Sequence, residues 1–260
     1  MVPATLAVYI CQWWGKLSTS KRIPSLDGLR ALSISLVLLG HLGGTRGFPV
    51  VELGVGDYAH LGVVVFFVIS GFLITRLLLA EQAKCGYISL KLFYARRTLR
   101  LFPASYAYIA CILLLSSFGF VHVNGKDIWH AATYTVNYLP ERSWVIGHLW
   151  SLSVEEQFYL LWPIAFLFLK PRKIVWVAVG MILLGPVARS AAWFLLKGSP
   201  LHDQPLFPMV ADSLAVGCLL ANIGTWLLRQ QWYLTLCKPV FSFLTFLLVL
   251  MTCPQTPHTA

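Results

Sequence analysis

Seven long apolar stretches constrain the fold of this chain more than any other feature. They cover roughly residues 26–42, 59–80, 101–120, 147–169, 174–196, 205–228 and 237–253. A transmembrane helix needs about 20 apolar residues, and a helix satisfies its own backbone hydrogen bonds in lipid. Only 12% of residues are charged and 58% are hydrophobic, whereas a soluble domain carries about 25% charged residues. The sequence therefore predicts an all-α, polytopic transmembrane helix bundle of about seven or eight spans.

The segments between the spans predict no additional domain. Residues 1–25 hold a short apolar run followed by basic residues, which is the wrong order for a cleaved signal peptide. The basic segment 84–100 fits a short helix on the membrane surface, and residues 121–147 fit a re-entrant or interfacial piece. We expect three parts: an N-terminal extension or interfacial segment (1–25), a single membrane domain (26–253) and a polar tail (254–260).

Basic residues orient the predicted bundle. Fourteen of the twenty Lys and Arg residues fall in the segments 16–22, 76–100, 170–173 and 229–238, which alternate to one side of the membrane. Cytoplasmic loops are rich in Lys and Arg, so we expect a multi-pass protein of the cell (inner) membrane with a cytoplasmic N-terminus. The net charge of +10 follows from this bias and does not indicate a nucleic-acid partner.

The first span carries two ionisable side chains on one stripe. Arg30 and His41 are eleven positions apart, which corresponds to ~1100° of rotation and ~16 Å of rise, so they share a helix face. Ionisable groups in a bilayer are expensive and usually functional. We expect a path across the membrane, with Arg30 at its cytoplasmic end and His41 at its outer end.

His41 is a candidate general base if a carboxylate steadies its imidazole. The span 147–169 offers Glu155 and Glu156, and Glu155 is preferred because its helix face also carries Ser151 and Tyr159. The alternative is an interfacial histidine that only hydrogen-bonds a loop.

A second candidate site lies in the basic segment. Arg97 and Arg100 are three positions apart, with Arg96 adjacent, so two guanidinium groups can reach one anion such as a phosphate. Taken by composition alone, arginines that merely contact lipid headgroups are the favoured alternative.

Two further groups of polar residues favour structural roles. Arg189 and Asp212 fit an ion pair between helices. The six cysteines are scattered and the histidines lack helical ligand spacing, so we expect no metal site.

Five motifs, in order, resemble the integral-membrane acyltransferase-3 family, whose members O-acylate bacterial surface and secreted glycans. They are IPSLDGLRALSISLVLLGHL, HLGVVVFFVISGFLIT, FYARRTLRLFPASY, HLWSLSVEEQFYLLWP and, more weakly, ADSLAVGCLLA. Together they cover roughly residues 23 to 222.

The resemblance implies residue roles. His41 matches the family's essential histidine and Arg30 its partner, Arg97 and Arg100 match the Arg-x-x-Arg that holds acyl-CoA phosphates, and Glu155 matches the acidic residue of the fourth motif. The implied function is O-acylation, with acyl-CoA, most commonly acetyl-CoA, as donor and a glycan or lipid-linked saccharide as acceptor.

The chain departs from the family in three respects. Val64 and Val210 stand where polar and arginine residues are usual, and the family domain typically exceeds three hundred residues with about ten spans. We therefore expect a domain that is incomplete at its C-terminus, as a fragment or a truncated gene product, with a minimal family member as the alternative. The alternatives are a small-anion transporter that uses Arg30, Arg189 and outer histidines as a relay, and an inactive truncated family member.

Overall fold

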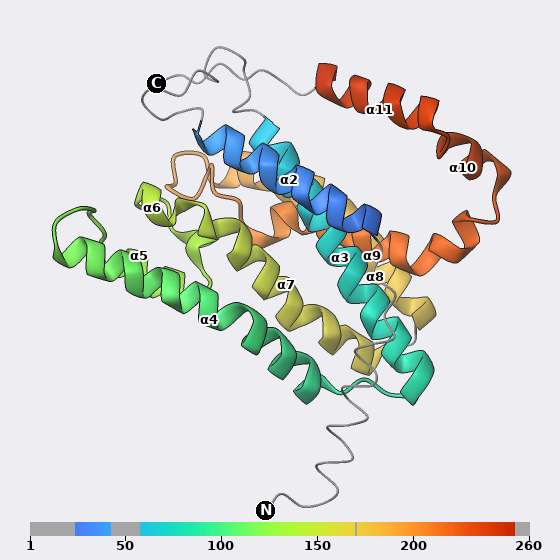
Figure 1. Ribbon diagram of the computed structural model, residues 1–260, viewed down its shortest axis with the longest axis horizontal. Helices are drawn as coiled ribbons and strands as arrows, with labels where there is room; N and C mark the ends of the chain where they lie inside the picture. The colour runs from blue at the N-terminus through green and yellow to red at the C-terminus, as the bar shows by residue number, and fades with distance from the viewer. Residues whose placement is uncertain (1–23, 43–57, 170, 253–260) are drawn as a thin grey trace, which may run out of the picture.

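A computed structural model describes residues 24–42, 58–169 and 171–252, and in these ranges every regular element is a helix (Figure 1). The helices are α2 (Pro24–Leu42), α3 (Tyr58–Cys85), α4 (Leu90–Ser117), α5 (Gly125–Ala132), η3 (Val136–Tyr138), α6 (Trp144–Gly147), α7 (Leu149–Phe168), α8 (Pro171–Leu195), α9 (Phe207–Leu227), α10 (Gln231–Leu236) and α11 (Pro239–Thr252). The predicted all-α fold is confirmed. The predictions for the N-terminal extension and the polar tail fall almost wholly outside the described residues.

Among the described residues, five helices are long and apolar enough to cross a membrane, namely α2, α3, α4, α8 and α9. The chain is thus a multi-pass membrane protein. Helix α11 has 14 residues and rises only ~21 Å, less than the ~30 Å hydrocarbon core of a bilayer. Figure 1 shows it apart from the other long helices, beyond α10. A count of seven or eight spans stays a prediction.

Helix α4 corrects the expectation of a separate surface helix before the third span. The basic segment from Leu90 and the following apolar segment form one 28-residue helix that runs through Pro103. Proline removes one backbone donor and usually kinks a soluble helix, but proline is tolerated within helices of membrane bundles. The arginines of this segment therefore stand on the first turns of a long helix instead of on a detached surface piece.

Helix α3 is the centre of the bundle, because it packs against both α2 and α9, and α9 packs in turn against α8. Glycines permit these contacts. A Cβ atom on Gly71 would lie 2.0 Å from the Leu214 carbonyl oxygen, and one on Gly217 would lie 2.0 Å from that of Val68. No side chain fits at these two points, so backbone meets backbone as in other small-residue helix contacts in membranes.

The close approach of α3 and α9 predicts that two glycines of α9 respond differently to substitution by alanine. We expect Gly217→Ala to lower the thermal midpoint of the detergent-purified protein, because overpacking costs about 1–3 kcal/mol. Gly224→Ala is the matched control: a Cβ there meets nothing within 4 Å, and alanine favours a helix by about 0.5–1 kcal/mol over glycine. Equal midpoints for the two variants would contradict the α3–α9 packing.

Helix α7 supplies much of the apolar core. Phe158, Trp162 and Phe166 are each 3% exposed or less and pack with Phe67 of α3 and Leu214 of α9. The Trp162 indole Nε1 donates a hydrogen bond of 2.8 Å to the Thr75 hydroxyl. This packing fixes the rotation of α7 about its axis and so determines where its polar residues point.

The three short elements α5, η3 and α6 cover the end of the bundle where α4 ends and α7 begins (Figure 1). They contain eight, three and four residues, too few to cross a bilayer, as expected for residues 121–147. The hydroxyl groups of Tyr106 and Tyr108 tie α5 and α6 to α4 by donating to the carbonyl oxygens of Ala132 (3.0 Å) and Val145 (2.5 Å).

Candidate active site

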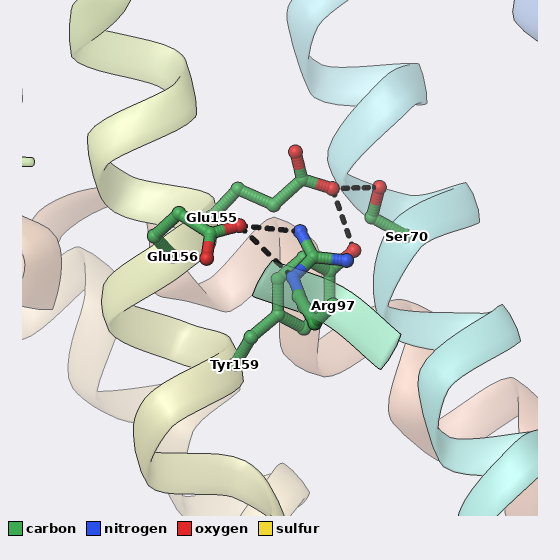
Figure 2. Close-up of polar contacts among 5 residues, drawn as sticks. All are labelled: Ser70, Arg97, Glu155, Glu156 and Tyr159. Carbon is green, nitrogen blue, oxygen red and sulfur yellow. Dashed lines mark hydrogen bonds and ion pairs between the residues drawn. The ribbon is translucent and has the colours of Figure 1, made fainter. Parts of the chain in front are cut away.

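Glu155 is buried inside the bundle. It lies on α7 and is 6% exposed. One of its carboxylate oxygens, Oε1, accepts hydrogen bonds from the hydroxyl groups of Ser70 on α3 and Tyr159 one turn along α7, the latter at 2.6 Å (Figure 2). A buried carboxylate needs such partners, and these two hold Glu155 at the α3–α7 contact.

The neighbouring Glu156 pairs with Arg97 of α4. Arg97 donates to Glu156 Oε1 from Nε (2.9 Å) and Nη2 (2.6 Å), and its guanidinium lies 3.1 Å from the centroid of the Tyr159 ring. The side chains of Arg97 and Glu156 are only 18% and 14% exposed. Figure 2 shows all five residues converging between α3, α4 and α7, so this buried polar cluster links three helices.

His41 lies in the last turn of α2 and opens onto a cavity. The cavity measures about 310 Å³ and is lined by His41, Arg142, Trp144, Gly147, His148 and Trp150. His41 Nδ1 lies 2.8 Å from the Val37 carbonyl oxygen. If Nδ1 carries the proton and donates there, Nε2 is left with its lone pair available to accept a proton.

The predicted pairing of His41 with Glu155 stays a prediction. Within the described residues no hydrogen bond or ion pair joins the two side chains, and Glu155 is held by Ser70 and Tyr159 instead. Glu155 also lies seven residues, ~10 Å of helix rise, beyond His148 of the cavity. Any effect of Glu155 on His41 therefore acts over a distance or through intervening groups.

The predicted arginines occupy three different settings. Arg30 on α2 is half-buried, and its Nε is a buried nitrogen without a hydrogen-bond partner among the described residues. Arg96 pairs with Glu81 at 3.4 Å, and Arg100 is exposed. Since Arg97 is engaged with Glu156, Arg100 is the more accessible member of the predicted phosphate-binding pair.

Arg189 and Asp212 form the predicted ion pair between α8 and α9, with Nη2 and Oδ2 2.8 Å apart. Arg189 also donates to the Met209 carbonyl oxygen from Nη1. In the described ranges no group of three His, Cys, Asp or Glu residues is arranged to hold a metal ion.

Sequence reasoning missed most of the cavity wall. Arg142 precedes α6 and Trp144 begins it, and a helix of four residues is too short to give a periodic signal; Trp150 is the second residue of α7. The one available sign was a cation, Arg142, in a loop of the side poor in basic residues. Burial lowers the pKa of the Arg142 guanidinium, although an arginine stays charged near neutral pH.

A bundle of apolar helices, with a histidine-lined cavity at one end and buried charges within, defines a polytopic membrane protein with a site for polar chemistry. Residues 23–257 match the family described as the acyltransferase domain, and the chain belongs to this family. The resemblance drawn from the five motifs is thereby confirmed.

Two similar proteins carry more specific names. Peptidoglycan O-acetyltransferase OatA of Listeria monocytogenes is 35% identical over 78% of this chain and 34% of its own length. O-acetyltransferase OatA of Staphylococcus aureus is 34% identical over 62% of this chain and 28% of its own length. The chain thus spans about a third of the length of the curated relatives it matches. No solved structure matches it.

Proposed function

We propose that this protein transfers an acyl group, most simply acetyl, from acyl-CoA to a hydroxyl group of a glycan. The names of two relatives, a peptidoglycan O-acetyltransferase and an O-acetyltransferase, support the acetyl group and the glycan acceptor. The observation that carries the proposal is the cavity into which His41 opens. A histidine that lines a cavity of this size meets the first requirement of a general base, which is access to the substrate proton.

The donor enters from the opposite end of the bundle. There the first turns of α4 carry Arg96, Arg97 and Arg100, and in the proposed orientation this end faces the cytoplasm, where acyl-CoA is found. Phosphate groups bind arginine through charge-assisted hydrogen bonds. Arg100 makes the first contact, and Arg97 contributes either from its pair with Glu156 or after leaving it.

The reaction proceeds at His41. His41 Nε2 takes the proton from an acceptor hydroxyl, whose oxygen attacks the thioester carbonyl carbon. The new carbon–oxygen ester bond replaces the carbon–sulfur bond, and the proton passes to the departing thiolate sulfur. Holding both reactants in one cavity supplies the rate advantage of proximity.

Arg30 and Glu155 support this chemistry from within the bundle. The unpartnered Nε of Arg30 is suited to an oxygen of the donor as it passes toward His41, because an unpaired buried donor gains about 1.5–3 kcal/mol from a charged partner. Glu155 stabilises the imidazolium form of His41 electrostatically.

Donor binding gives a direct test through Arg100. We expect Arg100→Gln to weaken acetyl-CoA binding to the detergent-purified protein about tenfold, since about 1.4 kcal/mol corresponds to a factor of ten. Isothermal titration calorimetry measures this, and Lys91→Gln, an exposed cation in the first turn of the same helix, is the control. Binding unchanged by Arg100→Gln would remove Arg100 from the donor site, and no binding by the wild type would favour anion transport over acyl transfer.

A further inference from the structure

The ion pair of Arg97 and Glu156 is not the strongest that an arginine and an anion can form. Arg97 donates from Nε (2.9 Å) and from Nη2 (2.6 Å), but both bonds end on the same carboxylate oxygen, Glu156 Oε1 (Figure 2). The strongest pairs are bidentate, with two parallel bonds to two separate oxygens. An anion that offers two oxygens to Arg97 at once therefore makes a better partner than Glu156 does.

Both side chains of the pair are largely, but not fully, withdrawn from water. Arg97 is 18% exposed and Glu156 is 14% exposed. A charge in such a place needs a counter-ion, so Glu156 compensates the charge of Arg97 as long as no other anion is bound. The remaining exposure means that a solute can still reach the guanidinium group.

Other contacts attach α4 to the bundle one turn away from the pair. The Tyr94 hydroxyl donates a hydrogen bond of 2.8 Å to the Leu160 carbonyl oxygen of α7. Phe93 is 3% exposed and belongs to the apolar core that α7 supplies. Because these contacts do not involve Arg97, the guanidinium group can change its partner without separating the two helices.

The surroundings of Arg97 favour such a change of partner. Its guanidinium lies 3.1 Å from the centroid of the Tyr159 ring, and the attraction of a cation to an aromatic face needs no carboxylate. Arg100 is exposed and stands three positions further along α4, so the two arginines lie on neighbouring turns of one helix face. A phosphate-bearing molecule bound to Arg100 thus comes close to Arg97.

We infer that Glu156 competes with the donor's phosphate groups for Arg97: the ion pair is the donor-free state, and donor binding transfers Arg97 from Glu156 to a phosphate. This competition rests on the proposed function, which takes the anion to be acyl-CoA. Glu156 is then a positioning residue that sets the donor affinity through Arg97. The apparent dissociation constant rises as the fraction of protein with Arg97 released falls, so removing the charge of Glu156 should tighten donor binding.

Isothermal titration calorimetry of the full chain in detergent with acetyl-CoA tests the competition. We expect Glu156→Gln, which removes the charge and keeps the shape, to bind acetyl-CoA about tenfold more tightly than the wild type. Glu155→Gln is the matched control, because it makes the same change at the preceding residue, whose carboxylate is bonded to Ser70 and Tyr159 instead. Its affinity should stay close to that of the wild type. In an Arg97→Gln background, Glu156→Gln should bring no gain.

A purely structural ion pair predicts a different result: Glu156→Gln would bind acetyl-CoA as tightly as the wild type or less tightly, which would overturn the competition. An equal gain in Glu155→Gln, or a gain that persists without Arg97, would overturn it too. Glu156→Asp keeps the charge on a shorter side chain and should give a smaller gain; it replaces Glu156→Gln if thermal midpoints show that the latter is unfolded. Failure of the proposed function has its own signature, because the wild type and every variant would then bind no acetyl-CoA, and the competition would fall with it.

Discussion

His41→Ala is expected to lower acyl transfer at least about 100-fold, because a positioned general base contributes about 10²–10⁴-fold to a rate. The side chain lies at the last turn of α2 and is exposed, so its loss removes little packing. The amount of protein in the membrane and its thermal midpoint should stay near those of the wild type. Mass spectrometry of the glycan product from purified membranes gives the rate.

His122→Ala is the matched control, because His122 is also exposed and lies in the loop between α4 and α5. It should retain full activity. Comparable activity in both variants would show that His41 is an interfacial histidine, which is the alternative that the sequence left open. A His41→Ala protein that is absent from the membrane would instead give His41 a structural role.

Arg97→Met is expected to destabilise the protein by about 3–5 kcal/mol, because removing one partner of a buried ion pair leaves the other as an uncompensated charge. The charge left without a counter-ion is that of Glu156, whose side chain is 14% exposed. Glu156→Leu should destabilise the protein by a similar amount, because it leaves Arg97 without its counter-ion. The double variant Arg97→Met/Glu156→Leu should recover most of the loss, since both charges are gone.

Unfolding of the detergent-purified variants, followed by circular dichroism, measures these differences. Arg96→Met is the control, because its contact with Glu81 is longer, at 3.4 Å, and its side chain is more exposed, at 26%. A double variant less stable than either single variant would show that Arg97 and Glu156 act independently. This series also separates two roles: Arg100→Gln should weaken donor binding alone, whereas Arg97→Met should weaken both binding and stability.

The sequence predicted the helices well because hydropathy reports directly on burial in lipid. It failed at the junction before the third span, where the basic residues of 84–100 indicated a separate helix on the membrane surface. In the structure the helix continues from Leu90 to Ser117. Intrinsic signals of helix termination are weaker within a membrane bundle, because neighbouring helices and the absence of competing water favour the continuous helix.

The candidate site was harder to predict, because a sequence gives the face on which a side chain lies but not the helix that covers that face. The polar face of Glu155 and Tyr159 was recognised, and these residues do interact. The partner of Glu156 was missed, because nothing in the spacing links α7 to Arg97. In the cavity wall, Arg142 is held by a hydrogen bond to Gln204 and the adjacent Ser143 by one to Asp127, and no periodic pattern reveals these contacts.

The most direct test places donor and acceptor on opposite sides of a membrane. The full chain is reconstituted in vesicles, with isotope-labelled acetyl-CoA on the side of Arg100 and a glycan acceptor on the side of His41. The proposed path predicts labelled acetyl ester on the glycan with the wild type and at least about 100-fold less with His41→Ala. Absence of label from the glycan with the wild type, or equal labelling with His41→Ala, would contradict acyl transfer across the bundle by this chain.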